Sequence, residues 1–360
     1  MRVMHISDWI SLHHLDRMTD STGLIQHAIY CLPRRESGYT TDDNARALRL
    51  CTRLWRRHQD EPLLRRISTY LSFLEFAHCP GRGFHNFMSY QRYWLDAEGC
   101  GDCQGQAVRA LAEVLGSTLP DDYRQLSREL IKSVLPFLAD LRSIRAQAYI
   151  TLAWSHLWAT GTSDIEQLES IAWGASQRLV ECYHRAQRPD WKWFESHMTY
   201  ANAVIPQALL VAGKRWPKEE FLDVAQSSFD FLDRVTTTGD MFWPVGNSGW
   251  YPHREDKALY DQQPVEAVCM AEAAWVAYDL LHDEKYLACF HRARAWFHGQ
   301  NSLHVPLVEV PAGACCDGLQ SNGVNRNQGA ESTLAYLWTE LNHLEVQQTL
   351  DQTSRDSIAS

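Results

Sequence analysis

The 360-residue sequence predicts an all-α protein built as an (α/α)6 toroid, a barrel of six inner and about six outer helices. Helix-period apolar patterns recur along the whole chain, whereas β-branched alternation is confined to short pieces such as residues 304–310. Six segments rich in Ala, Leu and small residues alternate with segments that carry charged faces. A helix that is apolar nearly all round is buried, and one with a charged stripe faces water. The alternation therefore indicates an inner and an outer ring of helices.

Each expected inner helix begins with a polar or glycine-containing opening. The openings are T-T-D-D-N-A-R-A-L from Thr40, G-D-C-Q-G-Q-A-V-R-A-L-A from Gly101, S-I-R-A-Q-A-Y-I-T-L-A from Ser143, E-S-H-M-T-Y-A-N-A-V-I-P-Q-A-L-L from Glu195, D-Q-Q-P-V-E-A-V-C-M-A-E-A from Asp261 and N-R-N-Q-G-A-E-S-T-L-A-Y-L from Asn325. The expected outer helices cover residues 62–77, 121–141, 165–186, 218–235 and 284–297. Parallel inner helices of a closed ring start at one rim, so all six openings are expected there. An open solenoid is the alternative, but it would not explain why polar and aromatic residues gather at one end of every buried helix.

The chain is expected to form one catalytic domain over residues 1–344. Residues 345–360 are polar and lack core-forming side chains, so they are expected to be a disordered tail.

Composition narrows the range of partners. The formal net charge is −10, which leaves no broad basic field for nucleic acid or anionic membranes. The opening M-R-V-M-H-I-S-D-W-I lacks the apolar core of a secretory signal, and no stretch of about 20 apolar residues occurs. The ten cysteines are scattered, as is typical of reduced thiols. We therefore expect a cytoplasmic protein that binds neither nucleic acid nor membrane.

Carboxylates at the openings are candidates for glycoside chemistry. Asp43 is expected to stay ionised and to activate water or hold a hydroxyl, although Asp42 and Asp43 could also simply cap their helix. Glu195 follows Trp191 and Trp193, so burial against indoles is expected to keep it protonated as the proton donor. Inversion needs carboxylates about 6.5–9.5 Å apart, which favours Asp43 with Glu195 over Asp42 with Asp43. The expected catalytic residues are Asp43, Glu195, Asp102 and Asp261.

Aromatic loops between the helices indicate a sugar-binding surface. They are F-H-N-F-M-S-Y-Q-R-Y-W from Phe84, D-W-K-W-F-E from Asp190 and M-F-W-P-V-G-N-S-G-W-Y-P from Met241. Indole and phenol rings pack on the C–H faces of sugars, while amides, imidazoles and carboxylates bond the hydroxyls. The alternative is that the rings only bury helix ends. The expected substrate-binding residues are Asp42, His85, Asn86, Trp94, Trp193, His197, Asn202, Trp243, Asn247, Trp250, Gln262, Gln263, Asn327 and Glu331.

No cofactor and no metal are expected. The sequence has no glycine-rich phosphate loop, no H-E-x-x-H zinc signature and no G-x-S-x-G nucleophile elbow. Cys100 and Cys103 form C-G-D-C, and Cys315 adjoins Cys316, so four thiolates could be counted toward zinc. Their spacing is nonspecific, and no metal site is expected.

Five motifs in order resemble one protein family. They are G-Y-T-T-D-D-N-A-R-A-L, F-H-N-F-M-S-Y, P-V-G-N-S-G-W-Y-P, Y-D-Q-Q-P-V-E-A and N-Q-G-A-E-S-T-L-A-Y-L. Together they resemble a bacterial group of glycosidase-like proteins with (α/α)6 folds, often encoded beside or fused to glycosyltransferases and near mannoside phosphorylases. The resemblance implies carbohydrate metabolism and a neighbouring glycosyltransferase as a partner. Where relatives tend to read E-D-S-H-G-R-A, this chain has G-D-C-Q-G-Q-A, which retains Asp102 and places Gln104 at the position of a His.

The leading hypothesis is an inverting glycoside hydrolase acting on a small oligosaccharide by paired carboxylate catalysis. Phosphate could replace water, with Arg46 and Arg145 as ligands, which would make a phosphorylase. A second hypothesis is a sugar epimerase or isomerase that uses His85 and His197 as acid and base. A third is a non-catalytic glycan-binding partner of a glycosyltransferase.

Overall fold

The computed structural model describes residues 10–162 and 165–359. The start of the N-terminal segment used above to argue against a secretory signal lies outside these residues, as does Ser360 at the end of the expected tail. Within the described ranges, no helix combines the length and the apolar character needed to cross a membrane.

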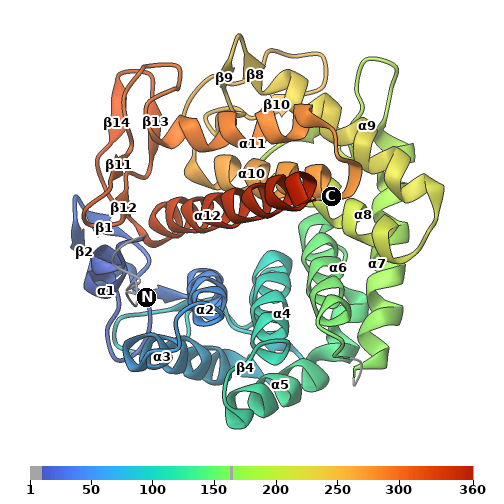
Figure 1. Ribbon diagram of the computed structural model, residues 1–360. Coiled ribbons are helices and arrows are strands. Elements are labelled where there is room, and N and C mark those ends of the chain that lie inside the picture. The colour runs from blue at the N-terminus through green and yellow to red at the C-terminus, as the bar shows by residue number, and fades with distance from the viewer. Residues whose placement is uncertain (1–9, 163–164, 360) are drawn as a thin grey trace.

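Six helices form a closed inner ring. They are α2 (Thr41–Trp55), α4 (Gly101–Leu115), α6 (Ile144–Ala159), α8 (Val204–Arg215), α10 (Pro264–Leu281) and α12 (Ala330–Ala359). Each packs against the next, and α12 packs against α2 to complete the circle (Figure 1). All six lie in or just after the openings identified in the sequence, and the (α/α)6 prediction is confirmed.

The outer helices alternate with the inner ones along the chain. They are α3 (Glu61–Ala77), α5 (Asp121–Asp140), α7 (Glu166–Ala186), α9 (Glu219–Val235) and α11 (Glu284–Phe297), and each packs on the inner helix that precedes it. The short α1 (His13–Met18) packs on α12. In α9, Phe221 and Phe229 are buried while Glu219 is not, which is the one-sided pattern expected of an outer helix.

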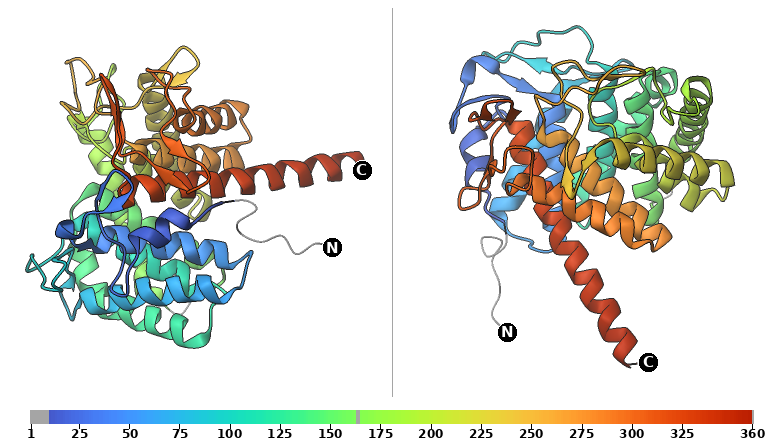
Figure 2. Two further views of the ribbon diagram at one scale, coloured as in Figure 1. Left: turned by 90° about the vertical axis from the view of Figure 1, so that its left-hand side faces the viewer. Right: turned by 90° about the horizontal axis from the view of Figure 1, so that it is seen from above.

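Short antiparallel strands occur within the loops between helices. They are β1 (Ala28–Ile29), β2 (Leu32–Pro33), β3 (Tyr39–Thr40), β4 (His78–Cys79), β5 (Gly83–Phe84), β6 (Phe87–Met88), β7 (His197–Met198), β8 (Thr237–Thr238), β9 (Met241–Phe242), β10 (Tyr251–Pro252), β11 (Val308–Glu309), β12 (Ala314–Cys315), β13 (Gly318–Gln320) and β14 (Gly323–Asn325), with a 3-10 turn, η2, at Arg35–Ser37. Strands and long loops gather at one end of the barrel, away from the projecting end of α12 (Figure 2). β3 pairs with β6 with Thr40 opposite Phe87, and β3 runs directly into α2. This register brings the loop containing Asn86 to the start of α2.

Small residues let the inner helices approach closely. Gly105 of α4 faces Tyr149 of α6, and a Cβ on Gly105 would fall 2.8 Å from the Tyr149 Cβ, which is too close for any larger residue without movement. This approach sets Gln106 and Tyr149 on neighbouring helices of the interior. The Ala-rich composition of the six openings therefore has a packing reason.

The C-terminal segment differs from the expected disordered tail. α12 continues as one helix from Ala330 to Ala359 and projects beyond the rest of the barrel (Figure 2). Val346 is fully buried, and Glu345 Oε1 accepts a hydrogen bond of 2.9 Å from Arg53 Nε of α2. These tertiary partners, together with Leu350 packed on the core, anchor a polar segment whose own sequence gives little reason for order.

Two other boundaries moved. Glu195 was expected to open the fourth inner helix, but α8 begins only at Val204, after β7 and a turn. The strand signal at residues 304–310 yields only the two residues of β11.

Candidate active site

A cavity of about 340 Å³ opens where the inner helices begin, and we call it the mouth cavity. Its lining comes from the N-terminal loop, the starts of α2 and α12, β6 and the β12–β14 region. The lining residues are Gln26, His27, Thr40, Asp42, Asp43, Arg46, Asn86, Phe87, Gln263, Asp317, Asn325, Gly329, Ala330, Glu331 and Ser332. Four of them are carboxylates, and among these residues Arg46 is the one arginine or lysine. The mouth cavity is therefore acidic.

The first turn of α2 supplies two of the four carboxylates. Thr40 is the N-cap, and its hydroxyl oxygen accepts a hydrogen bond of 3.1 Å from the Asp43 backbone N–H. The same hydroxyl donates to Asp43 Oδ2 at 2.8 Å, so the Asp43 side chain is held beside the cap. Capping by Thr is the local reason why the helix starts here.

Burial dominates the electrostatics of both aspartates. A helix N-terminus favours negative charge by about 0.3–1 kcal/mol. Burial nevertheless raises the pKa of Asp42 to about 6, against the opposing charge of Arg46 and with a further contribution from Asp43. Burial likewise raises the pKa of Asp43 to about 6, again opposed by Arg46. Both groups therefore titrate close to neutral pH, as acid–base catalysts do.

Arg46 joins α2 to α12 at this point. Its guanidinium lies 3.2 Å from Asp43 Oδ1 and 3.2 Å from Glu331 Oε2. The Glu331 side chain is 44% exposed, whereas that of Asp43 is 5% exposed. Glu331 is thus the member of this trio with ready access to solvent.

Asn86 and Ser332 hold the remaining acids in place. Asn86 Nδ2 donates to Asp42 Oδ2 at 3.2 Å, and the Asp42 backbone N–H donates to Asn86 Oδ1 at 3.2 Å. The other oxygen of Asp42, Oδ1, is buried and has no hydrogen-bond partner within the described chain. Asp317 accepts from the Gly329 N–H at 2.7 Å and from the Ser332 hydroxyl, and burial raises the Asp317 pKa.

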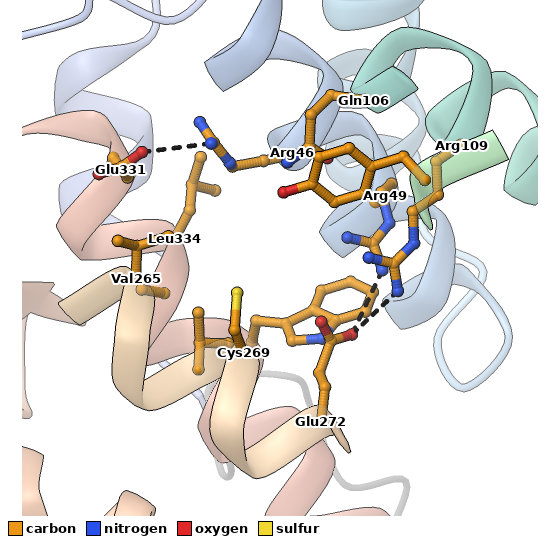
Figure 3. A pocket seen from close by; sticks show the side chains of 13 residues that line it. Arg46, Arg49, Gln106, Arg109, Val265, Cys269, Glu272, Glu331 and Leu334 are labelled. Atoms are coloured by element: carbon orange, nitrogen blue, oxygen red, sulfur yellow. Dashed lines mark hydrogen bonds and ion pairs between the residues drawn. The ribbon is translucent and has the colours of Figure 1, made fainter. Parts of the chain in front are cut away.

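A second, much smaller cavity, with space for only a few water molecules, lies inside the ring, and we call it the inner chamber (Figure 3). It adjoins the mouth cavity, since Arg46 and Glu331 line both. Its other lining residues are Arg49, Gln106, Arg109, Tyr149, Val265, Val268, Cys269, Glu272, Leu334, Ala335 and Trp338.

Asp102 and Glu195, both expected to be catalytic, belong to a different group that we call the rim network: Asp102, Arg145, Glu195 and Tyr200. Asp102 accepts from the Ser143 hydroxyl at 2.6 Å and from the Tyr200 hydroxyl. Arg145 lies 3.4 Å from Glu195 and donates to the Tyr200 carbonyl at 2.6 Å. Glu195 lines a separate recess with residues of α7, so the structure does not bring Glu195 into the cavity that Asp43 lines.

The predicted aromatic platforms are mostly tied into the protein. Trp193 is fully buried, so its ring has no face free for a sugar. Trp94 is stacked on His85 with ring centroids 4.8 Å apart, and His85 Nδ1 lies 2.8 Å from the Asp96 carbonyl oxygen. Trp243 Nε1 donates to the Leu259 carbonyl at 3.1 Å. Trp250 is half-buried, with its ring centroid 6.3 Å from that of Tyr200, beside the rim network.

The remaining predicted residues divide in the same way. Asn86, Gln263 and Glu331 line the mouth cavity together with Asp42 and Asp43. The others lie outside it. Asn202 donates to the buried Glu266 at 2.9 Å, and Gln262 is fully buried. Asn327 accepts from the Tyr30 N–H, the Asn247 N–H donates to the Asp261 carbonyl, and His197 is exposed on β7. Burial raises the pKa of Glu266 to about 7.

Several residues of the two cavities escaped the sequence reasoning. Asp317 stands in an irregular loop with no motif, and no local signal marks it. Gln106 follows Asp102 at the spacing of one helical turn and was a detectable neighbour. Gln104, which stands at the position of a His in similar sequences, bonds the backbone of Phe84 through both its amide oxygen and its nitrogen at 2.8 Å, so its role here is structural.

The cysteines do not gather. All ten are free thiols, and Cys103 and Cys315 are buried while Cys100 is exposed. Among the residues that the structure describes, no group of three or more His, Cys, Asp or Glu side chains is arranged to hold a metal ion.

No protein-family model matches the sequence, and no curated protein matches it either. Solved structures match the fold. The cellobiose 2-epimerase of Bacillus thermoamylovorans B4167 aligns with a TM-score of 0.70 at 14% identity, over 94% of this chain and 97% of that chain. The GH76 α-mannanase of Bacteroides thetaiotaomicron aligns with a TM-score of 0.66 at 11% identity, over 93% of each chain. The cellulase Cel9M of C. cellulolyticum, in complex with cellobiose, gives 0.63 at 10% identity, over 92% of this chain and 90% of that chain.

At these identities the likeness establishes the (α/α)6 fold alone. Fold and site together define a helical toroid with an acidic cavity at the rim where its inner helices begin. Function has to be argued from that cavity.

Proposed function

We propose that the chain is an inverting glycoside hydrolase that cleaves a small, uncharged oligosaccharide in the mouth cavity. The observation that carries the proposal is the adjacent pair of the half-buried Asp42 and the buried Asp43, with pKa values of about 6, in one open cavity with the solvent-accessible Glu331. Buried acids held near neutral pKa are unfavourable for folding at neutral pH and are typical of catalytic sites. The solved proteins of this fold named above as an epimerase, a mannanase and a cellulase are sugar-processing enzymes by name, which agrees with the proposal.

Asp42 is the proposed proton donor. Its pKa of about 6 keeps part of it protonated near neutral pH, and it lines the mouth cavity. Asp43, by contrast, is bound by both Arg46 and Thr40. We assign Asp43 the task of positioning Arg46.

Glu331 is the proposed base. It projects from α12, the neighbour of α2 in the ring, and so faces the donor from a second helix, as a wide acid–base separation requires. Glu331 takes a proton from water, and the water oxygen bonds to the anomeric carbon. Asp42 gives its proton to the glycosidic oxygen as that carbon–oxygen bond breaks. This replaces the expected pairing of Asp43 with Glu195, which the geometry supports less well because Glu195 lies in another recess.

The charge of the mouth cavity favours water over phosphate as nucleophile. Its lining has four carboxylates, and Arg46 is already shared by two of them. Arg145, the other expected phosphate ligand, is held by Glu195 and by the Tyr200 carbonyl. A phosphate dianion would meet net repulsion there.

The epimerase alternative has weaker support. Among the described residues that line the two cavities, His27 is the one histidine, and neither His85 nor His197 is among them. Carboxylates supply the titrating groups of this site.

The test is turnover of a panel of neutral oligosaccharides of defined linkage, with and without phosphate, followed by NMR of the first-formed anomer. We expect shorter sugars, inverted at the anomeric carbon, at a rate independent of phosphate. A sugar 1-phosphate, or an epimer of unchanged chain length, would contradict the hydrolase assignment.

A further inference from the structure

We propose that the ring of Phe87 is the platform on which the departing sugar unit of the substrate packs in the mouth cavity. The assignment to the departing unit rests on the hydrolase function proposed above. The contact with a sugar rests on the position and the surroundings of Phe87 alone.

The lining of the mouth cavity suits a ligand that has both polar groups and an apolar face. Among the described residues that line it, Phe87 is the one Phe, Tyr or Trp. Apart from Gly329 and Ala330, the other lining residues are polar or charged, and they include the amides of Gln26 and Gln263. Sugars combine C–H faces, which pack on aromatic rings, with hydroxyls, which bond amides and carboxylates. The volume of about 340 Å³ lies at the small end of the range of about 300–1,000 Å³ that is typical of small-molecule sites.

The ring of Phe87 is available to a ligand. Phe87 is 45% exposed, and its ring contacts no other aromatic ring in the part of the chain that the structure describes. Two aromatic residues of the same loop differ in this respect, since Tyr90 stacks on Tyr39 with ring centroids 6.1 Å apart and Trp94 stacks on His85 at 4.8 Å. An exposed apolar side chain is ordinary by itself, but one that lines a polar cavity is a candidate binding surface.

The backbone of Phe87 is fixed by bonds that do not involve the ring. Phe87 pairs with Thr40 between β6 and β3. Its N–H donates to Asp96 Oδ1 at 3.1 Å, and its carbonyl accepts from the Leu95 N–H at 2.8 Å. A side chain on a fixed backbone has less freedom to lose when a ligand binds, so the ring is well placed to serve as a platform.

Phe87 lies on the side of the proposed proton donor. The preceding residue, Asn86, bonds Asp42, and the strand partner, Thr40, caps the helix that carries Asp42. The proposed base, Glu331, projects from a different helix, α12. In an inverting displacement the attacking water and the leaving oxygen lie on opposite sides of the anomeric carbon, so the departing unit lies on the side of the acid. Phe87 is therefore placed to hold the departing unit.

Titration with methyl hexosides, followed by NMR, tests the contact with a sugar. Phe87→Ala should weaken the best methyl hexoside about ten-fold, because the aromatic face is lost. Phe87→Trp restores an aromatic face and should bind within about two-fold of the parent. Phe87→Leu keeps an apolar side chain, which guards against a folding defect, and should still weaken binding by several-fold because it lacks a flat face.

The matched control is Phe76→Ala. Phe76 is 53% exposed, but it lies on the outer helix α3 and is not among the described residues that line the mouth cavity. Phe76→Ala should bind as the parent does. Equal binding by the parent and Phe87→Ala would overturn the proposal, as would the absence of any methyl hexoside binding or an equal loss in Phe76→Ala.

Cleavage kinetics test the assignment to the departing unit. On an oligosaccharide, Phe87→Ala should lower kcat/KM about ten-fold. The matching glycosyl fluoride releases fluoride and has no departing sugar, so its kcat/KM should change by less than about two-fold. An equal loss on both substrates would overturn the assignment to the departing unit. If methyl hexosides bind in a Phe87-dependent way while no oligosaccharide is cleaved, the hydrolase proposal fails and the sugar contact stands.

Discussion

The mouth cavity and the rim network both place carboxylates near the starts of inner helices, but they differ in how those carboxylates are compensated. In the rim network, Asp102 receives two hydroxyl donors and Glu195 faces Arg145. In the mouth cavity, Asp43 is buried and Asp42 is half-buried, desolvation raises the pKa of both, and both share the field of Arg46 with Glu331. Similar residue types at equivalent places in the fold are thus prepared for different work. We propose that the compensated acids hold loops in place and that the less compensated acids take part in proton transfer.

The sharpest way to break this comparison is the same substitution at both places. Asp42→Asn should lower kcat by about 10²–10⁴-fold, since a positioned acid is lost, whereas Asp102→Asn should lower it by less than about ten-fold. Substrates with an activated leaving group should partly restore Asp42→Asn, because such a group needs no proton. Glu331→Gln should lower kcat by a similar factor, and an activated leaving group should not restore it.

Initial rates on both substrate types measure these effects, with Asp283→Asn at the N-cap of the outer helix α11 as a control for the chemical change itself. An Asp102→Asn defect as large as that of Asp42→Asn would move the catalytic centre to the rim network.

Replacing the arginine of the mouth cavity and that of the rim network should reduce stability with different pH dependences. Arg46→Met leaves Asp43 and Glu331 without their shared cation and should reduce the free energy of unfolding by about 3–5 kcal/mol at pH 8. The loss should be smaller at pH 5, because Asp42 and Asp43, with pKa values of about 6, then take up protons. Besides its ion pair with Glu195, Arg145→Met removes hydrogen bonds to the Tyr200 carbonyl and the Thr199 hydroxyl, which do not titrate, and its loss should vary less with pH. Urea unfolding at both pH values measures this contrast. An equal pH dependence of the two variants would contradict the electrostatic difference between the mouth cavity and the rim network.

The smallest expected effect is on the pH dependence of stability in the unmodified protein. The folded-state pKa of Asp42 lies above the ordinary value of 3.8, so the folded state binds this proton more tightly than the unfolded state. Its stabilising contribution is therefore present at low pH and is lost as pH rises from about 4 through about 6. The loss amounts to about 2–3 kcal/mol at most. Stability curves of Asp42→Asn and the parent should converge as pH falls and separate in favour of Asn at pH 8; parallel curves would show that Asp42 is not desolvated.

The order of the helices, and the position of Asp42 and Asp43 at the start of α2, could be predicted from the sequence alone. Apolar periodicity is a local property, and it located the six inner helices, apart from the start of α8, and five outer helices. Thr40 with Asp42 and Asp43 is a local N-cap pattern, and it correctly placed two carboxylates at the start of α2. Sequence patterns also suggested glycan chemistry, which remains a proposal.

Tertiary structure alone decided which carboxylates meet. Glu331 reaches Asp43 through Arg46 because α12 returns to lie beside α2, and no local pattern encodes that closure. Glu195 lies in another recess because a loop, and not the helix itself, precedes α8. The helix continues after residue 345, where Glu345 bonds Arg53 and Leu350 packs on the core. The protonation of Asp42 was decided in the same way: burial and neighbouring charges set a pKa, and both are properties of the folded surroundings.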